Sequence, residues 1–336
     1  MQTVYFIINQ HHNHESIIKA GGGASEYLFY LTAKILSSYF NVIVYNRDSP
    51  CKMDGLEYRF LPDNMKPDID NNSVVIVQRH FNVLIDLHKI NPANKYILWS
   101  HDYLHDEFSN LSGNYNPSEI NDYFVKHDIQ IVSVSHFHKG NILSRLPNVN
   151  VTPIYNALFP EYFIKHTDID YDKNTIIFAS NWGKGLDKVL NIGKHYYKKN
   201  KEFKLILIKP KYCDWEPELH EYPFIEKRGC IENKNEYCKL LQSCLCVFST
   251  SFPETFGCVF AEALHLDVPV IGDNSVQAGF HEIIPHELMC NFNNPNEVIY
   301  KIENLRNNRP HVTLDKKFYA EIVIDEWVKL LNYNIL

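Results

Sequence analysis

Residues 244–273, CLCVFSTSFPETFGCVFAEALHLDVPVIGD, decide the fold. CLCVFST is a short apolar run of the kind that forms a buried strand. VFAEALHL follows with Val259, Ala263 and Leu266 at helical spacing, and VPVIG is a second short apolar run. The stretch therefore predicts a strand–helix–strand unit whose two strands lie parallel in one sheet.

The same alternation extends through the rest of the chain. Before a polar segment at residues 166–174 the apolar runs are VYFIIN, VIVY, SVVIVQ, YILWS, IQIVSVS and VTPIY, and after it TIIFAS and KLILIK precede the stretch above. We expect an α/β protein with two doubly wound, Rossmann-like domains, at residues 1–160 and 161–310. The length of 336 residues agrees with two hydrophobic cores.

The last segment, residues 311–336, predicts an amphipathic helix of about five turns. Its apolar positions follow steps of four residues, and they are Tyr319, Val323, Trp327 and Leu331, beside Ile322 and Leu330.

Composition excludes several classes of protein. The formal net charge of -7 disfavours a nucleic-acid partner, which needs a clustered basic surface. MQTVYFIINQ lacks the features of a leader peptide, and no apolar run approaches ~18 residues. We therefore expect no transmembrane segment and a cytoplasmic protein with at most a weak membrane association. The 8 cysteines form no CxxC pair and are interpreted as reduced core residues.

Two carboxylates and a glycine mark the candidate site. Gly257 falls at the start of the predicted helix, where free N–H groups and the helix dipole favour an anion. Glu254 precedes this turn and Glu262 lies within the helix. Because a carboxylate repels a phosphate, these acids suit neutral hydroxyl groups such as those of sugars. Spacing alone also allows a helix-capping Glu254 and a solvated Glu262.

The segment resembles the E-x(7)-E motif of the family 4 retaining glycosyltransferases (group 1), which have the GT-B fold. Other stretches resemble that family in the same order: AGGGASEYLFYLTAKIL, ILWSHDYLHD, IVSVSHFHKGNIL, TPIYNAL, FASNWGKGLDKVL and AGFHEII. The resemblance covers nearly the whole chain. It implies two Rossmann-like domains facing a central cleft, with the C-terminal helix crossing back to the first domain.

The resemblance also implies roles for the carboxylates and the turn between them. Glu254 would contact the donor sugar and Glu262 the ribose of a nucleoside diphosphate sugar, either a UDP-sugar or a GDP-sugar. Phe256 belongs to the same motif, and Gly257 and Cys258 would offer backbone N–H groups to the diphosphate.

A cation is expected to stabilise the leaving diphosphate. Lys184, in NWGKG, resembles the family's lysine for this task. Many members also carry an arginine a few residues earlier, where this chain has Ser180, Asn181 and Trp182. Lys209 and Lys211 are candidates to replace it, because their strand is expected beside TIIFAS. Arg228 is expected where the backbone meets the base, with its side chain in reach of the phosphates.

The first domain is expected to add a histidine and a glycine loop. His101 directly follows YILWS and resembles the histidine that hydrogen-bonds the donor sugar near the reacting carbon, with Asp102 orienting it. His105 is the less favoured alternative. Gly22 and Gly23, in the glycine run at 21–23, would let the backbone approach the phosphates and the acceptor.

Two patterns suggest a metal and are discounted. Asp68-Ile69-Asp70 and Asp168-Ile169-Asp170 each spell D-x-D, but both precede a predicted strand, whereas the metal-binding motif follows one. The cluster HHNHE, with His11, His12, His14 and Glu15, lies in a loop where solvation or acceptor contact is favoured. We expect no metal and no cofactor beyond the donor co-substrate.

The leading hypothesis is transfer of a sugar to a hydroxyl group of a glycan or glycoconjugate acceptor, with the anomeric configuration retained. The loops at residues 9–19 and 102–119 are expected to contact that acceptor. A second hypothesis is another GT-B enzyme, such as an epimerase or a phosphorylase. A third, motivated by the missing arginine, is a protein that binds nucleotide-sugars without turnover.

Overall fold

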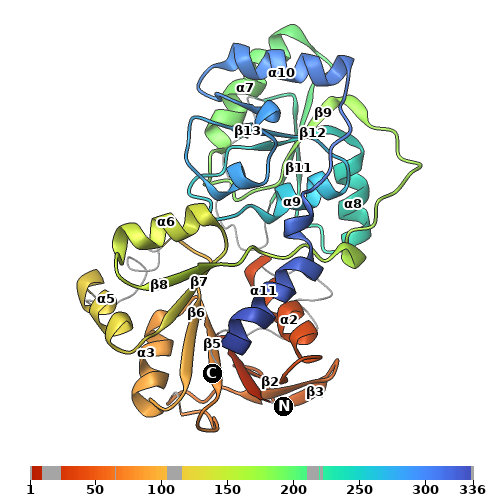
Figure 1. Cartoon of the computed structure of the whole chain (residues 1–336). Coiled ribbons are helices and arrows are strands. Elements are labelled where there is room, and N and C mark those ends of the chain that lie inside the picture. The colour runs from red at the N-terminus through yellow and green to blue at the C-terminus, as the bar shows by residue number, and fades with distance from the viewer. Residues whose placement is uncertain are drawn as a thin grey trace. The chain divides into compact units, whose positions relative to one another are not determined.

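The computed structural model describes residues 2–9, 24–64, 66–103, 116–209, 219 and 222–333. Their contacts divide the chain into two units. Unit 1 holds the described residues up to Ala157 together with those from Ala320 onward, and unit 2 is Leu158–Tyr319. Each unit is built on a mainly parallel sheet with helices packed against it (Figure 1). The predicted α/β class is therefore confirmed.

The described strands of unit 1 form one sheet in the order β3-β4-β2-β1-β5-β6-β7-β8. All neighbours are parallel except β3 and β4. Every residue of β5 is buried, as expected for a strand that is covered on both faces. The strands are β1 (Thr3–Ile7), β2 (Asn41–Asn46), β3 (Cys51–Met53), β4 (Leu56–Phe60), β5 (Val74–Gln78), β6 (Lys95–Trp99), β7 (Gln130–Ser133) and β8 (Asn150–Pro153).

The described strands of unit 2 form a second sheet, β11-β10-β9-β12-β13-β14, in which all neighbours are parallel. Cys244 and Cys246 are fully buried in β12, as the sequence predicts. Cys230 is exposed, so the interpretation of all the cysteines as core residues was wrong. The strands are β9 (Asp172–Phe178), β10 (Lys204–Ile208), β11 (Ile225–Arg228), β12 (Cys244–Ser249), β13 (Val270–Asp273) and β14 (Met289–Cys290).

Helices connect the parallel strands. Those of unit 1 are α2 (Ala24–Leu36), α3 (Phe81–Ile90), α5 (Pro117–Lys126), α6 (His136–Arg145) and α11 (Ala320–Tyr333). Those of unit 2 are α7 (Leu186–Lys199), α8 (Lys234–Gln242), α9 (Cys258–His265) and α10 (Pro295–Asn307).

The last helix, α11, packs on α2 of unit 1 (Figure 1). Its 14 residues make about four turns, one fewer than predicted, because Lys316–Phe318 form a separate 3-10 turn. Val323, Trp327 and Leu331 are buried as predicted. Ile322 is 41% exposed, so its assignment to the buried face was wrong.

Helix α9 also differs in detail from its prediction. Its buried side chains are Phe260, Ala261, Ala263 and Leu264. Val259 was expected on this face but is only half-buried. The core face is therefore rotated by about one residue from the predicted one.

In each sheet the chain extends in both directions from its first strand. In unit 1 the chain leaves β1 in opposite directions toward β2 and β5, and in unit 2 β9 is flanked by β10 and β12. At such a point the loops after two neighbouring strands diverge and leave a crevice at their carboxyl ends, which is where ligands bind in open α/β sheets. The loops after β9 and β12 carry Lys184 and Glu254, respectively.

No helix in the described part of the chain is both long and apolar enough to span a membrane.

Candidate active site

Gly257 lies at the amino terminus of α9, as the sequence predicts. This residue is the N-cap, with φ of 106°, a conformation that favours glycine. A Cβ at this position would lie 2.5 Å from Cδ2 of Phe260. Glycine is therefore required here by its φ and by the Phe260 ring packed against it. The first-turn N–H groups and the positive end of the helix dipole favour an anion at this end of α9.

Lys184 and Glu254 come together at the strand-order reversal of unit 2. Nζ of Lys184 lies 3.5 Å from Oε2 of Glu254. The lysine side chain is 37% exposed and the glutamate side chain 17% exposed, so both remain accessible to a ligand. The structure thus unites two of the three predicted catalytic residues, which are 70 positions apart in the sequence. At this position a cation can stabilise the charge of a phosphate leaving group, and an acid can accept hydrogen bonds from the hydroxyl groups of a sugar.

Glycines hold the loops that carry this pair. The N–H of Gly279 donates to the carbonyl oxygen of Glu254 at 2.9 Å, and a Cβ on Gly279 would lie 2.0 Å from the carbonyl oxygen of Thr255. Gly185, with φ of 91°, accepts from the Thr250 hydroxyl at 2.9 Å. The two loops are therefore fixed by backbone contacts that a larger side chain would disrupt.

Glu262 is half-buried on α9 rather than fully solvated. Its Oε2 accepts a hydrogen bond of 2.8 Å from the Tyr237 hydroxyl, on α8. Burial first, and the nearby Glu262 charge second, raise the pKa of Tyr237 well above its ordinary value, so the phenol stays protonated. Nothing in the sequence singled out Tyr237, because its distance from Glu262 depends on how α8 and α9 pack.

Lys209 directly follows β10, and Arg228 is the last residue of the neighbouring strand β11. β10 pairs with β9, as expected, and the Lys209 N–H donates to the Arg228 carbonyl oxygen at 2.9 Å. The Arg228 guanidinium is paired with Glu226 at 2.6 Å, and both side chains are exposed. Trp182, near the place of the family's arginine, is buried and donates from Nε1 to the Ile208 carbonyl oxygen at 3.2 Å. Lys211 lies outside the described residues.

Phe256 and Cys258 flank the glycine at the helix start. The Phe256 side chain is buried against Phe318, with ring centroids 5.8 Å apart, so only its backbone is suited to a ligand contact. Cys258 is the first residue of α9 and is half-buried. The backbone contribution of both residues to anion binding stays a prediction.

In unit 1, His101 lies just beyond the carboxyl end of β6, as predicted, and is largely buried. Nε2 of Gln78 lies 3.5 Å from Nε2 of His101. Burial, followed by the charges of Arg79 and His138, lowers the pKa of His101 well below its ordinary value. The imidazole is therefore neutral at pH 7 and can exchange hydrogen bonds with a sugar hydroxyl.

Arg79 forms ion pairs with two acids and so holds the loop that follows β6, which carries His101. Arg79, which follows β5, donates from Nε to Asp102 at 2.5 Å and from Nη1 to Glu26 at 2.9 Å. Asp102 thus pairs with Arg79 instead of orienting His101, and its carbonyl oxygen accepts from His138 at 2.9 Å. Arg79 was missed, although its place as the first charged residue after a buried strand was a signal.

Several predicted positions lie outside the described residues. They are Gly22 and Gly23, the alternative histidine His105, and the cluster His11, His12, His14 and Glu15. Within the described part of the chain no three His, Cys, Asp or Glu side chains are placed to hold a metal. Both D-x-D sequences precede a strand, β5 and β9, as the sequence predicts.

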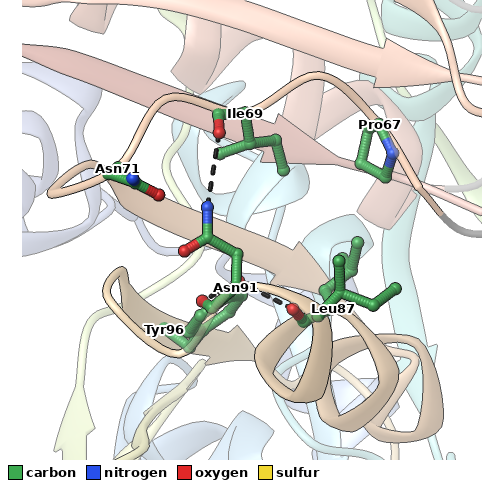
Figure 2. Close-up of a pocket in the computed structure, with 7 residues that line it drawn as sticks. Pro67, Ile69, Asn71, Leu87, Asn91 and Tyr96 are labelled. Carbon is green, nitrogen blue, oxygen red and sulfur yellow. Dashed lines mark hydrogen bonds between the residues drawn. The ribbon is translucent and has the colours of Figure 1, made fainter.

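A pocket of about 210 Å³ lies in unit 1 at the amino-terminal edge of the sheet. Figure 2 shows Asn91 donating to the carbonyl oxygen of Ile69 and the Tyr96 hydroxyl donating to that of Leu87. Because these bonds join the end of α3 to the segments that enter β5 and β6, the pocket is a packing crevice at the edge opposite His101. It is lined by Pro67, Ile69, Asn71, Leu87, Ile90, Asn91 and Tyr96.

The chain has the GT-B fold of glycosyltransferases, two Rossmann-like domains in one chain. Over 99% of both chains it is similar to a sucrose-phosphate synthase from Thermosynechococcus elongatus, with a TM-score of 0.70 and 12% identity. A UDP-forming α,α-trehalose-phosphate synthase from Burkholderia xenovorans gives a TM-score of 0.68 at 10% identity, over 100% of this chain and 99% of that one.

A third similar structure is the Anabaena protein HepE in complex with UDP and glucose. Its TM-score is 0.66 at 12% identity, over 99% of this chain and 100% of that one. No family model and no curated protein matches the sequence.

Proposed function

We propose that this protein is a retaining glycosyltransferase that transfers a sugar from a nucleoside diphosphate sugar to a hydroxyl acceptor. The observation that carries the proposal is the Lys184–Glu254 pair beside the amino terminus of α9, at the strand-order reversal of unit 2. This position suits a sugar diphosphate, because the cation and the helix N–H groups favour the phosphates and the acid can accept hydrogen bonds from the sugar hydroxyls. A UDP-sugar is the first donor to test, because HepE was solved with UDP and glucose; a GDP-sugar is the alternative.

The donor would bind with its diphosphate at the N–H groups of α9 and near Lys184. When the bond between the anomeric carbon and the phosphate oxygen breaks, negative charge develops on the diphosphate, and the lysine stabilises it. Lys184 would leave Glu254 as it turns to the phosphate. Glu254 would then accept hydrogen bonds from hydroxyl groups of the sugar.

The acceptor oxygen would form its bond to the anomeric carbon on the face that the diphosphate leaves. Its proton would pass to the departing phosphate oxygen, so no protein base is required. Neutral His101 would hydrogen-bond the sugar near this carbon. The residues work mainly by orientation and by charge stabilisation, and no metal is needed for these steps.

The first test is a thermal-shift panel of UDP, GDP, ADP and CMP, with and without Mg²⁺, on the wild type and on Lys184→Ala and Glu262→Ala. A ligand at ~100 times its Kd stabilises the folded protein by about 2.7 kcal/mol. We expect one diphosphate to raise the melting temperature without Mg²⁺, and both variants to lose that shift. Lys198 is an exposed lysine on α7, the helix that follows Lys184. Lys198→Ala is the control and should keep the thermal shift. No shift with any nucleotide would overturn the proposed donor site.

A protein that binds nucleotide-sugars without turnover is the second candidate, and buried Trp182 near the expected arginine favours it. Transfer to a hydroxyl acceptor, or slow hydrolysis of the donor, separates the two functions. Activity that is lost in Glu254→Ala would exclude the binding protein. Product with an inverted anomeric configuration would exclude the retaining mechanism.

A further inference from the structure

Tyr237 and Glu262 connect two helices that flank β12. Tyr237 lies on α8, which precedes the strand, and Glu262 on α9, which follows it. The Tyr237 hydroxyl donates to Oε2 of Glu262 at 2.8 Å. A hydrogen bond to a carboxylate is stronger than one between neutral groups, so the carboxylate is held in one orientation.

The position of Glu262 on its helix places this carboxylate near the proposed diphosphate site. Side chains on a helix lean toward its amino terminus, and residues four apart lie on the same face. Glu262 follows Cys258, the first residue of α9, by four positions. Its carboxylate therefore extends toward the first turn, where the N–H groups are offered to an anion.

Only one carboxylate oxygen is occupied by the tyrosine. Within the described part of the chain, Oε1 of Glu262 accepts no side-chain or backbone hydrogen bond, and the residue is half-buried rather than enclosed. Since the Tyr237 phenol stays protonated, Oε2 remains an occupied acceptor, and Oε1 is the oxygen left for a ligand.

We propose that Tyr237 is a positioning residue that fixes Glu262, so that Oε1 accepts from the ribose hydroxyls of the donor nucleotide. This inference rests on the proposed function, in which Glu262 contacts the ribose. It assigns to Tyr237 a part in distinguishing a ribose with both hydroxyls from one that lacks them.

Isothermal titration of UDP and of 2′,3′-dideoxy-UDP tests the assignment on the wild type and three variants. If GDP gives the thermal shift, GDP and its dideoxy form are used instead. Tyr237→Phe removes the hydroxyl and keeps the ring. Glu262→Ala removes the carboxylate. Tyr196→Phe is a matched control, because Tyr196 also donates to a glutamate, Glu303, between two other helices of unit 2.

We expect Tyr237→Phe to weaken binding of UDP by about three- to tenfold and binding of the dideoxy form by less than about twofold, because the lost interaction involves the ribose hydroxyls. Tyr196→Phe should change neither. Equal weakening of both ligands in Tyr237→Phe, or an unchanged Kd for UDP, would overturn the role of Tyr237. In those cases Glu262→Ala would still reduce the preference for UDP over the dideoxy form.

If Glu262→Ala binds both nucleotides as the wild type does, Glu262 does not contact the ribose, and the proposed function of this residue fails together with the inference. Melting curves of all variants accompany the titrations. Comparable melting temperatures for Tyr237→Phe and Tyr196→Phe show that a selective effect on UDP does not arise from general destabilisation of unit 2.

Discussion

His138 is a fully buried histidine with both ring nitrogens engaged. Nδ1 accepts from the Val134 N–H at 3.3 Å, and Nε2 donates to the Asp102 carbonyl oxygen at 2.9 Å. Burial lowers the pKa of His138 from 6.5 to about 4, although Asp102 acts in the opposite direction. The folded protein therefore holds a neutral imidazole at a pH where the unfolded chain would bind a proton.

This difference predicts a loss of stability in acid. A pKa that is lowered on folding means that the unfolded state binds more protons below pH 6.5, so the free energy of unfolding falls as the pH falls. For His138 the loss develops from about pH 6.5 to about pH 4 and reaches up to about 3 kcal/mol, with His101 adding a further loss in the same direction.

Urea unfolding between pH 7 and pH 4 measures the effect. His138→Gln should lower stability at pH 7 and flatten its pH dependence. His136→Gln replaces an exposed histidine on the same helix and is the control for the substitution itself. Parallel curves for the wild type and His138→Gln would contradict the prediction.

Residue positions next to strand ends could be predicted from sequence, but their partners could not. His101 was preferred over His105 because it adjoins YILWS, and the structure places it at the end of β6. Asp102 was expected to orient it and instead pairs with Arg79. The partner of Asp102 depends on how the loops after β5 and β6 approach one another. Residues that are close in the sequence do not determine that approach.

At the scale of elements, the loop that carries Glu254 depends on the glycine at 279. A Cβ there would lie 2.0 Å from the Thr255 carbonyl oxygen, a backbone atom that cannot move without displacing the loop. Gly279→Ala should therefore destabilise the protein by about 1–3 kcal/mol. It should also weaken nucleotide binding, because Glu254 and the start of α9 move together.

Thermal melts with and without UDP measure both effects. Gly140→Ala is the control, since Gly140 lies within α6 and an added Cβ meets nothing within 4 Å. That change should be neutral or stabilising by up to about 1 kcal/mol. If Gly279→Ala kept the wild-type melting temperature and UDP shift, the loop would not be fixed in this way.

The strands that could be predicted from sequence are the buried ones. Buried parallel strands are continuous apolar runs, and each run quoted above overlaps a strand of the structure. β3, β4, β11 and β14 were not predicted. β11 reads IEKR and is mostly exposed at the edge of its sheet, so its residues lack the apolar pattern. Its pairing with β10 is visible only in the structure.

At the scale of the whole molecule, the sequence order alone could not bring the candidate site together. Lys184 and Glu254 meet because β9 and β12 are neighbours while the intervening strands extend the sheet on the other side of β9. Alternation of strands and helices predicts a doubly wound sheet but does not specify which strands are neighbours. The resemblance to a known family supplied that information.

The chain returns to unit 1 through α11, which gives that unit a stabilising contact from the end of the sequence. Trp327 is fully buried, and its ring lies 4.9 Å from that of Trp99 on β6 in an edge-to-face arrangement. Trp327→Ala should therefore cost unit 1 about 3–5 kcal/mol. Ile322→Ala, on the same helix but 41% exposed, should cost less than about 1 kcal/mol.

Native-state hydrogen exchange distinguishes the two units, because it reports the stability of each strand separately. In Trp327→Ala the amides of β5 and β6 should exchange faster than in the wild type, while those of β12 and β13 keep their rates, because Trp327 packs within unit 1 and β12 and β13 belong to unit 2. Ile322→Ala should leave both sets unchanged. Equal acceleration of exchange in both units would show that they unfold as one cooperative body, so that loss of α11 would also destabilise the strand that precedes Glu254.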